Sequence, residues 1–293
     1  MKGLDELLGG VLVEYDAAVL EMVAQQFRRG MWKSVVSDAV EESGVEVESF
    51  GPVQVTAFGD LPEIVGLNQI QGAGEPDAVS GGYLAEAIEW MRAREVDYRV
   101  PVAEGRPASE EAEDWLGQRG YEQAGAWVKL VLDIGSAPPL EDTGIVVYKL
   151  GDHESDGEGL SSILSQAYGM PITAGTLFFS LPMEKRWHCY TAAADPEKGV
   201  VATALMLIQG GVAQLGPGAT LAHARGKGCN RALLRRRLLD AAAAGCHTAF
   251  VEVGECEPER FAAVRSNLLS AGFEEAYGSR IWQRPALRPS AVR

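Results

Sequence analysis

The sequence of 293 residues predicts an α/β (α+β) fold in two tandem units, each with a mixed, largely antiparallel sheet flanked by helices. The main observation is an order of elements that occurs twice. An amphipathic helix precedes a strand, and a second helix then ends at a glycine beside an aromatic residue, before a last strand with a tryptophan. The landmarks are residues 98–102, Gly120, Tyr121 and Trp127 in one copy, and residues 248–253, Gly272, Phe273 and Trp282 in the other.

The boundary between the two units is predicted in residues 133–144, "DIGSAPPLEDTG", which are rich in turn residues and poor in core residues. The following "IVVYKLGD" is typical of a first strand. We therefore expect an N-terminal unit over residues 1–137 and a C-terminal unit over residues 138–293. At this point two unrelated α/β domains remain the alternative to a true repeat.

The charge of the chain limits its partners. It has 26 Lys and Arg against 41 Asp and Glu, for a formal net charge of −15. Such a surface repels nucleic acid, so we expect no nucleic-acid partner. A local basic site for a small anion remains compatible with this balance.

The sequence shows no sign of a membrane protein. No apolar run approaches the roughly 20 residues that span a bilayer. Asp5 and Glu6 stand where a signal peptide needs apolar residues, so we expect a cytoplasmic protein. The cysteines have no CxxC spacing, which predicts free thiols and no metal site; they are Cys189, Cys229, Cys246 and Cys256.

One basic cluster stands out in this acidic chain, in "LAHARGKGCNRALLRRRLLD". It follows a predicted hairpin with a turn at residues 209–211. Pro217 in the second strand of that hairpin predicts a β-bulge, because proline cannot donate to a ladder. The cluster consists of Arg225, Lys227, Arg231, Arg235, Arg236 and Arg237, with no acid before Asp240.

The loop "ARGKGCN" opens the helix that carries this cluster. Gly226 and Gly228 allow the main chain to approach a ligand, and the helix start offers free N–H groups and the positive end of its dipole. These features predict a pyrophosphate site. The chain lacks GxxxxGK[ST] and an early GxGxxG, so the sequence favours neither a P-loop nor a Rossmann site.

The stretch resembles motif A of the GNAT superfamily of acetyl-CoA-dependent N-acyltransferases, [RQ]-x-x-G-x-[GA]. Arg225, Gly228 and Asn230 hold its three defined positions, and asparagine is also a good helix N-cap. Downstream, "VRSNLLSAGF" resembles the later helix and closing Gly-Phe of the superfamily. The resemblance spans about residues 145–282 and implies acetyl-CoA as the cofactor.

The N-terminal unit is similar to a degenerate copy of the same fold. Its corresponding loop, "QIQGAGEPDAVSGG", has no Arg-x-x-Gly. Glu75 and Asp77 would repel a phosphate there. The whole chain thus resembles a tandem GNAT protein with one working cofactor site.

The resemblance also implies which residues bind the cofactor. Gly218, Ala219 and Thr220 match the strand that pairs with the pantetheine arm, where a backbone N–H would polarise the thioester carbonyl. The loop residues around the pyrophosphate are Arg225, Gly226, Lys227, Gly228, Cys229, Asn230 and Arg231. We expect only part of the group Arg235 to Arg237 to reach the ligand, because helix geometry points them in different directions.

The catalytic groups are less marked. In many members of the superfamily a tyrosine four residues before the glycine of the closing Gly-Phe acts as the general acid. This chain has Leu268 at that position. For the general base we favour Glu252, on the strand after motif A, with Glu255 and His188 as weaker candidates. The likeness implies direct attack of an amine on the acetyl thioester.

The acceptor pocket is expected among aromatic residues of "AYGMPITAGTLFFSLPMEKRWHCY". The candidates are Tyr168, Phe178, Phe179, Trp187 and Tyr190, most of which we expect in the core. The acceptor would be a small-molecule amine or a peptide amine. The alternative function is a non-catalytic CoA-binding sensor or interaction protein on the same scaffold, motivated by Leu268.

Overall fold

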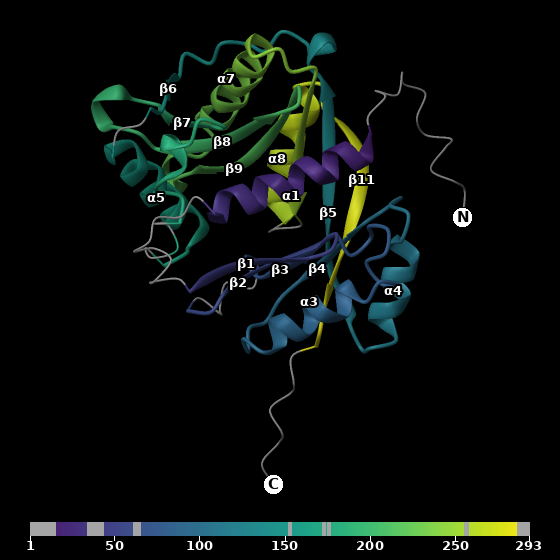
Figure 1. Ribbon diagram of the computed structural model, residues 1–293. Coiled ribbons are helices and arrows are strands. Elements are labelled where there is room, and N and C mark those ends of the chain that lie inside the picture. The colour runs from purple at the N-terminus through teal and green to yellow at the C-terminus, as the bar shows by residue number, and fades with distance from the viewer. Residues whose placement is uncertain are drawn as a thin grey trace.

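The computed structural model describes residues 16–33, 44–60, 66–151, 154–171, 174, 177–254 and 258–285. Its centre is an eight-stranded sheet in the order β4-β11-β5-β10-β9-β8-β7-β6, beside a three-stranded sheet β1-β2-β3 (Figure 1). Of the pairs in the larger sheet, β9 and β10 are parallel and the others antiparallel. The predicted class, a mixed α/β fold with a largely antiparallel sheet flanked by helices, is therefore confirmed.

The elements of the first half begin with a long helix and a small sheet. They are α1 (Ala17–Lys33), β1 (Val45–Phe50), β2 (Val53–Phe58), β3 (Gln69–Gln71), α3 (Tyr83–Arg92), β4 (Val100–Ala103), α4 (Ser109–Gly117) and β5 (Glu122–Asp133). A short parallel contact joins β3 to β4, where Ile70 N–H donates to Arg99 O at 2.9 Å.

The second half supplies most of the larger sheet. Its elements are β6 (Val146–Lys149), α5 (Glu154–Tyr168), β7 (Trp187–Ala193), β8 (Ala202–Gln209), β9 (Val212–Thr220), α7 (Cys229–Ala243), β10 (Thr248–Gly254), α8 (Pro258–Ser270) and β11 (Glu274–Gln283). The predicted order is present in both halves, as α3-β4-α4-β5 and α7-β10-α8-β11. Gly120 and Gly272, after α4 and α8, are left-handed with φ of 79° and 89°.

The last strands of the two halves are exchanged. β5 comes from the first half but lies between β10 and β11 of the second, and β11 lies between β5 and β4 of the first. In Figure 1 both run as long strands from the upper layer of the molecule to the lower one. The predicted division at residue 137 therefore falls in the chain between β5 and β6 and does not separate two independent sheets.

The sheet of the second half is covered on both faces. Ala204 and Met206 of β8 pack in one cluster with α7 and α8, whereas Leu205 and Leu207 pack in another with α5. This alternation follows from the period of two along a strand. The two faces therefore differ in which helices they carry, and α1 lies with α5.

Helix α1 belongs to the first half but packs on strands of the larger sheet. Asp16 caps it, with Oδ1 accepting from Ala18 N–H at 2.8 Å. Its buried residues recur at helical spacing and contact Val131, Val212 and Phe250 or the α5 cluster; they are Leu20, Val23, Ala24, Phe27 and Met31. In the described residues, no helix is both long and apolar enough to cross a bilayer.

Candidate cofactor and catalytic site

Strands β9 and β10 separate partway along their length. Their parallel pairing runs from Thr248 opposite Val212 to Val251 opposite Leu215 and then ends. Beyond this point residues 218–220 pair with β8, and residues 252–254 pair with β5. We call this opening the C-terminal fork. It leaves one edge of β9 without a neighbouring strand.

A β-bulge lies where the fork begins. Leu215 is opposite Met206 and Gly218 is opposite Ala204, so two residues of β9, Gly216 and Pro217, face one residue of β8. The bulge predicted from Pro217 is confirmed.

The direction of the backbone donors in β9 follows from the ladder. Leu221 N–H donates to Val201 O at 2.9 Å, toward β8. Alternation in an antiparallel ladder then turns the N–H groups of Gly218 and Thr220 away from β8. Both groups point to the open edge of the fork.

The loop before α7 has the geometry of an anion cradle. Gly226 and Gly228 are left-handed, with φ of 76° and 92°, and Gly228 is the N-cap residue. The first hydrogen bond of the helix runs from Ala232 N–H to Gly228 O at 3.0 Å. The N–H groups of residues 229–231 precede it and have no acceptor within the helix. The expectation that Asn230 caps the helix is wrong: it lies inside α7, where its Oδ1 accepts from Asn267 Nδ2 at 3.3 Å.

The basic cluster divides into separate groups. Arg225, Lys227 and Arg231 are exposed around the cradle. Arg235 and Arg236 instead line a pocket of about 160 Å³ on the β6 side of α7. The remaining lining residues are Asp142, Thr143, Ile145, Val147 and Ala232.

Arg237 has a role that its sequence context did not reveal. It is 5% exposed, and its Nη1 donates to Leu205 O at 3.1 Å and to Gly216 O at 3.4 Å. Burial lowers its pKa to about 10, so it stays cationic near neutral pH. Arg237 therefore stabilises the bulge through hydrogen bonds to its backbone and does not reach the surface.

Glu252, the predicted base, points from β10 toward α1. Its carboxylate forms an ion pair with Arg28 and lies 3.4 Å from Lys129 Nζ. Burial acts to raise its pKa, but Arg28 and Lys129 outweigh this and lower the pKa below the ordinary 4.5. The side chain is therefore ionised and largely buried at the start of the fork.

The two cations at Glu252 connect it to a wider network. Lys129, 2% exposed, also bonds Glu21 of α1, which accepts from Tyr277 Oη at 2.7 Å. The Arg28 guanidinium lies 5.2 Å from the ring centre of Trp127. These contacts join α1, β5, β10 and β11 at one place.

The other catalytic candidates lie elsewhere. His188 is on β7, two strands from β9, and its pKa is lowered chiefly by burial and then by Lys149. Leu268 is buried in the core between α8 and the sheet and has no proton to give. Glu255 lies outside the described residues.

The predicted acceptor pocket is only partly assembled. Phe178 and Trp187 are buried in one cluster under α5. Tyr190 points to the opposite face, toward α7, where its Oη donates to Asp240 at 2.8 Å. Tyr168 is 46% exposed, and its Oη donates to Gly218 O at 3.1 Å in the fork. The structure thus separates Tyr190 from Phe178 and Trp187, and it leaves Tyr168 at the surface.

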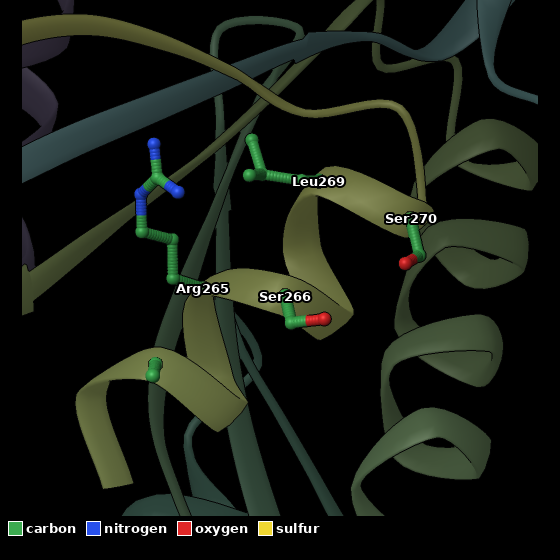
Figure 2. Close-up of a pocket in the computed structure, with 5 residues that line it drawn as sticks. Arg265, Ser266, Leu269 and Ser270 are labelled. Carbon is green, nitrogen blue, oxygen red and sulfur yellow. The ribbon is translucent and has the colours of Figure 1, made fainter. Parts of the chain in front are cut away.

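A further pocket of about 540 Å³ lies along α8 (Figure 2). Figure 2 shows Arg265, Ser266, Leu269 and Ser270 projecting from this one helix; Ala262 completes the lining. It contains none of the residues predicted for cofactor binding or catalysis.

The cysteines of the described chain follow the prediction. Cys189, Cys229 and Cys246 are buried free thiols. Cys256 lies outside the described residues. Within those residues, no group of three or more His, Cys, Asp or Glu side chains is arranged to hold a metal ion.

The first half contains a counterpart of the fork at β3 and β4. Helix α3 again starts after a left-handed glycine, Gly82, with φ of 80°. Here the loops after the two strands are joined, because Ala108 N–H donates to Gly74 O at 3.1 Å. Arg106 also forms a two-pronged pair with Glu75, at 3.0 and 2.8 Å. This N-terminal pair of strands is closed by its own loops.

Comparison with known proteins supports the fold. The chain has 16% identity to a GCN5-related N-acetyltransferase from Kribbella flavida, with a TM-score of 0.62, covering 93% of this chain and 98% of that one. For a GCN5-related N-acetyltransferase from Sphaerobacter thermophilus the identity is 15%, the TM-score 0.58, and the coverage 80% and 82%. No family model and no curated protein sequence matches the chain.

A third similar structure is a tandem GNAT protein from the clavulanic acid biosynthesis pathway. It has 13% identity and a TM-score of 0.55, covering 80% of this chain and 79% of that one. Identities this low establish a shared fold and leave activity to be argued from the site. The chain therefore has the fold of GNAT acetyltransferases over most of its length.

Proposed function

We propose that the protein is an acyl-CoA-dependent N-acyltransferase that transfers acetyl from acetyl-CoA to a primary amine. The observation that carries this proposal is the C-terminal fork ending in an exposed glycine cradle. The fork offers unpaired backbone donors along β9, and the cradle offers helix N–H groups at its wide end. Together they suit a ligand with a thioester at one end and phosphates at the other.

The cofactor residues of the proposal follow this geometry. Gly218, Ala219 and Thr220 would bind the pantetheine arm along β9. The pyrophosphate would lie on the cradle formed by Arg225, Gly226, Lys227, Gly228, Cys229, Asn230 and Arg231. Acetyl-CoA supplies an activated acyl group when bound.

In the proposed reaction the amine nitrogen forms a bond to the thioester carbon. The carbon–sulfur bond breaks, its electron pair leaves with sulfur, and the amine gives up a proton. The N–H groups of Gly218 and Thr220 would stabilise the negative charge that develops on the carbonyl oxygen. Arg237 would keep them in place by holding Gly216 O.

Glu252 remains our proposed proton acceptor. It is ionised and lies at the start of the fork, and the pairs with Arg28 and Lys129 set its position. Because Leu268 replaces the tyrosine acid, the departing thiolate would take its proton from water. Of the aromatic residues proposed for the acceptor pocket, Tyr168 donates from its Oη to Gly218 O in the fork.

We also propose that one cofactor binds per chain, in a reducing cytoplasm. The Glu75–Arg106 pair and the Ala108–Gly74 hydrogen bond occupy the region where the first half would need an opening. The buried free thiols suit a reducing compartment.

Two measurements test the proposal. Calorimetry with acetyl-CoA should give one site per chain, and thiol release should rise with at least one member of a panel of amines, including peptide N-termini. Two sites of similar affinity would contradict the single working cradle. Absence of any CoA binding would overturn the function as a whole.

A non-catalytic CoA sensor is the second candidate. Two observations favour it: Leu268 is a buried apolar residue where an acid is expected, and Glu252 is already paired with two cations. Tight acetyl-CoA binding without amine-dependent thiol release over the whole panel would favour the sensor.

A further inference from the structure

The start of the C-terminal fork is covered by an aromatic ring from the first half of the chain. Phe27 of α1 lies directly over Gly216. A methyl group added at Gly216 would be 2.8 Å from Cε2 of Phe27 and 3.2 Å from Cβ of Leu205. Real Cβ atoms do not approach so closely, so the ring and the glycine are in full contact.

The Phe27 ring is held firmly in this position. It is 3% exposed, and its centre lies 4.6 Å from that of Trp187 in an edge-to-face arrangement with an interplanar angle of 63°. It shares a buried cluster with Leu205 and Met31. A ligand cannot displace it without opening this cluster.

The next residue of α1 covers the other strand of the fork. Arg28 pairs with Glu252 of β10, so one turn of α1 closes this face at the narrow end. The cradle at the start of α7 defines the opposite, wide end. A thioester bound with its phosphates on the cradle must therefore place its acyl group next to Phe27.

We propose that Phe27 is a specificity-determining residue that limits the acyl group to a short chain such as acetyl. The inference rests on the proposed function and deepens it by assigning the class of acyl donor. A chain of several methylenes would have to occupy the volume of the ring. The first half of the molecule thus helps to select the ligand of the second.

The test measures binding and needs no knowledge of the acceptor. CoA, acetyl-CoA, butyryl-CoA and hexanoyl-CoA are titrated into the wild-type protein and into Phe27→Ala. For each protein the affinity of an acyl-CoA is divided by that of free CoA. Because free CoA also binds the cradle, this ratio cancels any effect of the substitution on the affinity of the cradle.

We expect hexanoyl-CoA to bind the wild-type protein at least about tenfold more weakly than acetyl-CoA. In Phe27→Ala this penalty should disappear, because each methylene that enters the vacated apolar space contributes about fourfold in affinity. Met31→Ala is the matched control: it removes a large side chain from the same helix and cluster but not from the contact with Gly216. It should keep the wild-type ratios.

Removal of a buried ring also destabilises the fold, so Phe27→Leu is included as a milder variant. It should keep circular dichroism and thermal unfolding near wild type and reduce the hexanoyl penalty. Equal binding of acetyl-CoA and hexanoyl-CoA by the wild type, or unchanged ratios in folded Phe27→Leu and Phe27→Ala, would overturn the inference. Neither outcome would touch the proposed function, which is tested separately by the binding of CoA and acetyl-CoA and by amine-dependent thiol release.

Discussion

The C-terminal fork and the N-terminal pair of strands start from the same geometry and end differently. In both, a strand leads through a loop to a helix that begins after a left-handed glycine, Gly228 or Gly82. The C-terminal loop is exposed and basic around that glycine. The N-terminal loop is bonded to the segment after β4 through Glu75 and Arg106.

The two regions also differ in whether the backbone N–H groups of the loop are already hydrogen-bonded. In the N-terminal loop, the N–H groups of Gly81 and Gly82 donate to Asp77 O and Val79 O, both at 2.9 Å. A donor that is already bonded within the loop offers little to a ligand. If the proposed function holds, a helix start after glycine is not sufficient for a phosphate site, and the loop must also leave its N–H donors unbonded.

The largest expected effect compares the two glycines directly. Gly228→Val should abolish CoA binding, because a β-branched residue resists the left-handed backbone that shapes the cradle, and its Cβ would lie 3.6 Å from Cβ of Thr143. Gly82→Val should leave binding unchanged. Valine should destabilise the fold by a similar amount at both positions, roughly 1–2 kcal/mol for a left-handed backbone. Calorimetry on both folded variants measures this, and normal binding by Gly228→Val would refute the cradle.

The next effect compares two partly buried ion pairs, Arg28–Glu252 and Arg106–Glu75. Glu252→Gln should lower turnover by on the order of 10²-fold with CoA affinity little changed, because it removes the proposed base. Glu75→Gln is the control for the loss of an ion pair alone. Both variants should lose roughly 1–3 kcal/mol of stability in urea. Equal turnover in the two variants would remove Glu252 from the chemistry.

A smaller effect is expected at the edge of the cradle. Arg225→Ala should weaken CoA binding by roughly 1.5–3 kcal/mol, the range for a hydrogen bond to a charged group. Arg235→Ala should have a smaller effect, since Arg235 lines the pocket between α7 and residues 142–147, where its Nε donates to Leu140 O at 3.1 Å. Titration with CoA distinguishes them, and a larger loss in Arg235→Ala would move the phosphate site to that pocket.

The smallest effect concerns acid stability. The pKa of Glu252 is lowered in the folded protein, so its contribution to stability is present above the ordinary value of 4.5 and is lost as the pH falls below it. Urea unfolding between pH 6 and pH 3 should therefore show a steeper decline for wild type than for Glu252→Gln. Parallel declines would show that the pairs with Arg28 and Lys129 do not control the ionisation of Glu252.

Much of the backbone geometry at the candidate site could be predicted from the sequence because its signals are local. The two glycines, the bulge at Pro217 and the helix after the loop each depend on a few neighbouring residues. The repeated order of elements also reflects local patterns. The sequence named Asn230 as the cap, but Gly228 holds that position because it adopts the left-handed backbone more easily.

The remaining features depend on contacts between distant segments. Arg237 belongs to a run of arginines, and only packing shows that it points inward to Gly216 O while Arg235 points elsewhere. The pairing of Glu252 with Arg28 joins residues far apart in the chain. No sequence pattern predicts that β5 and β11 each pair with strands of the other half, because the composition of a strand does not depend on which neighbour it pairs with.

The exchanged strands also restrict how the molecule can move. Swinging one half away from the other would require β5 to leave β10 or β11 to leave β4, and each step breaks a ladder of backbone hydrogen bonds. These ladders therefore oppose a hinged closure of two lobes. We therefore expect substrates to bind and products to leave through rearrangements of individual loops and side chains, while the sheet stays in place.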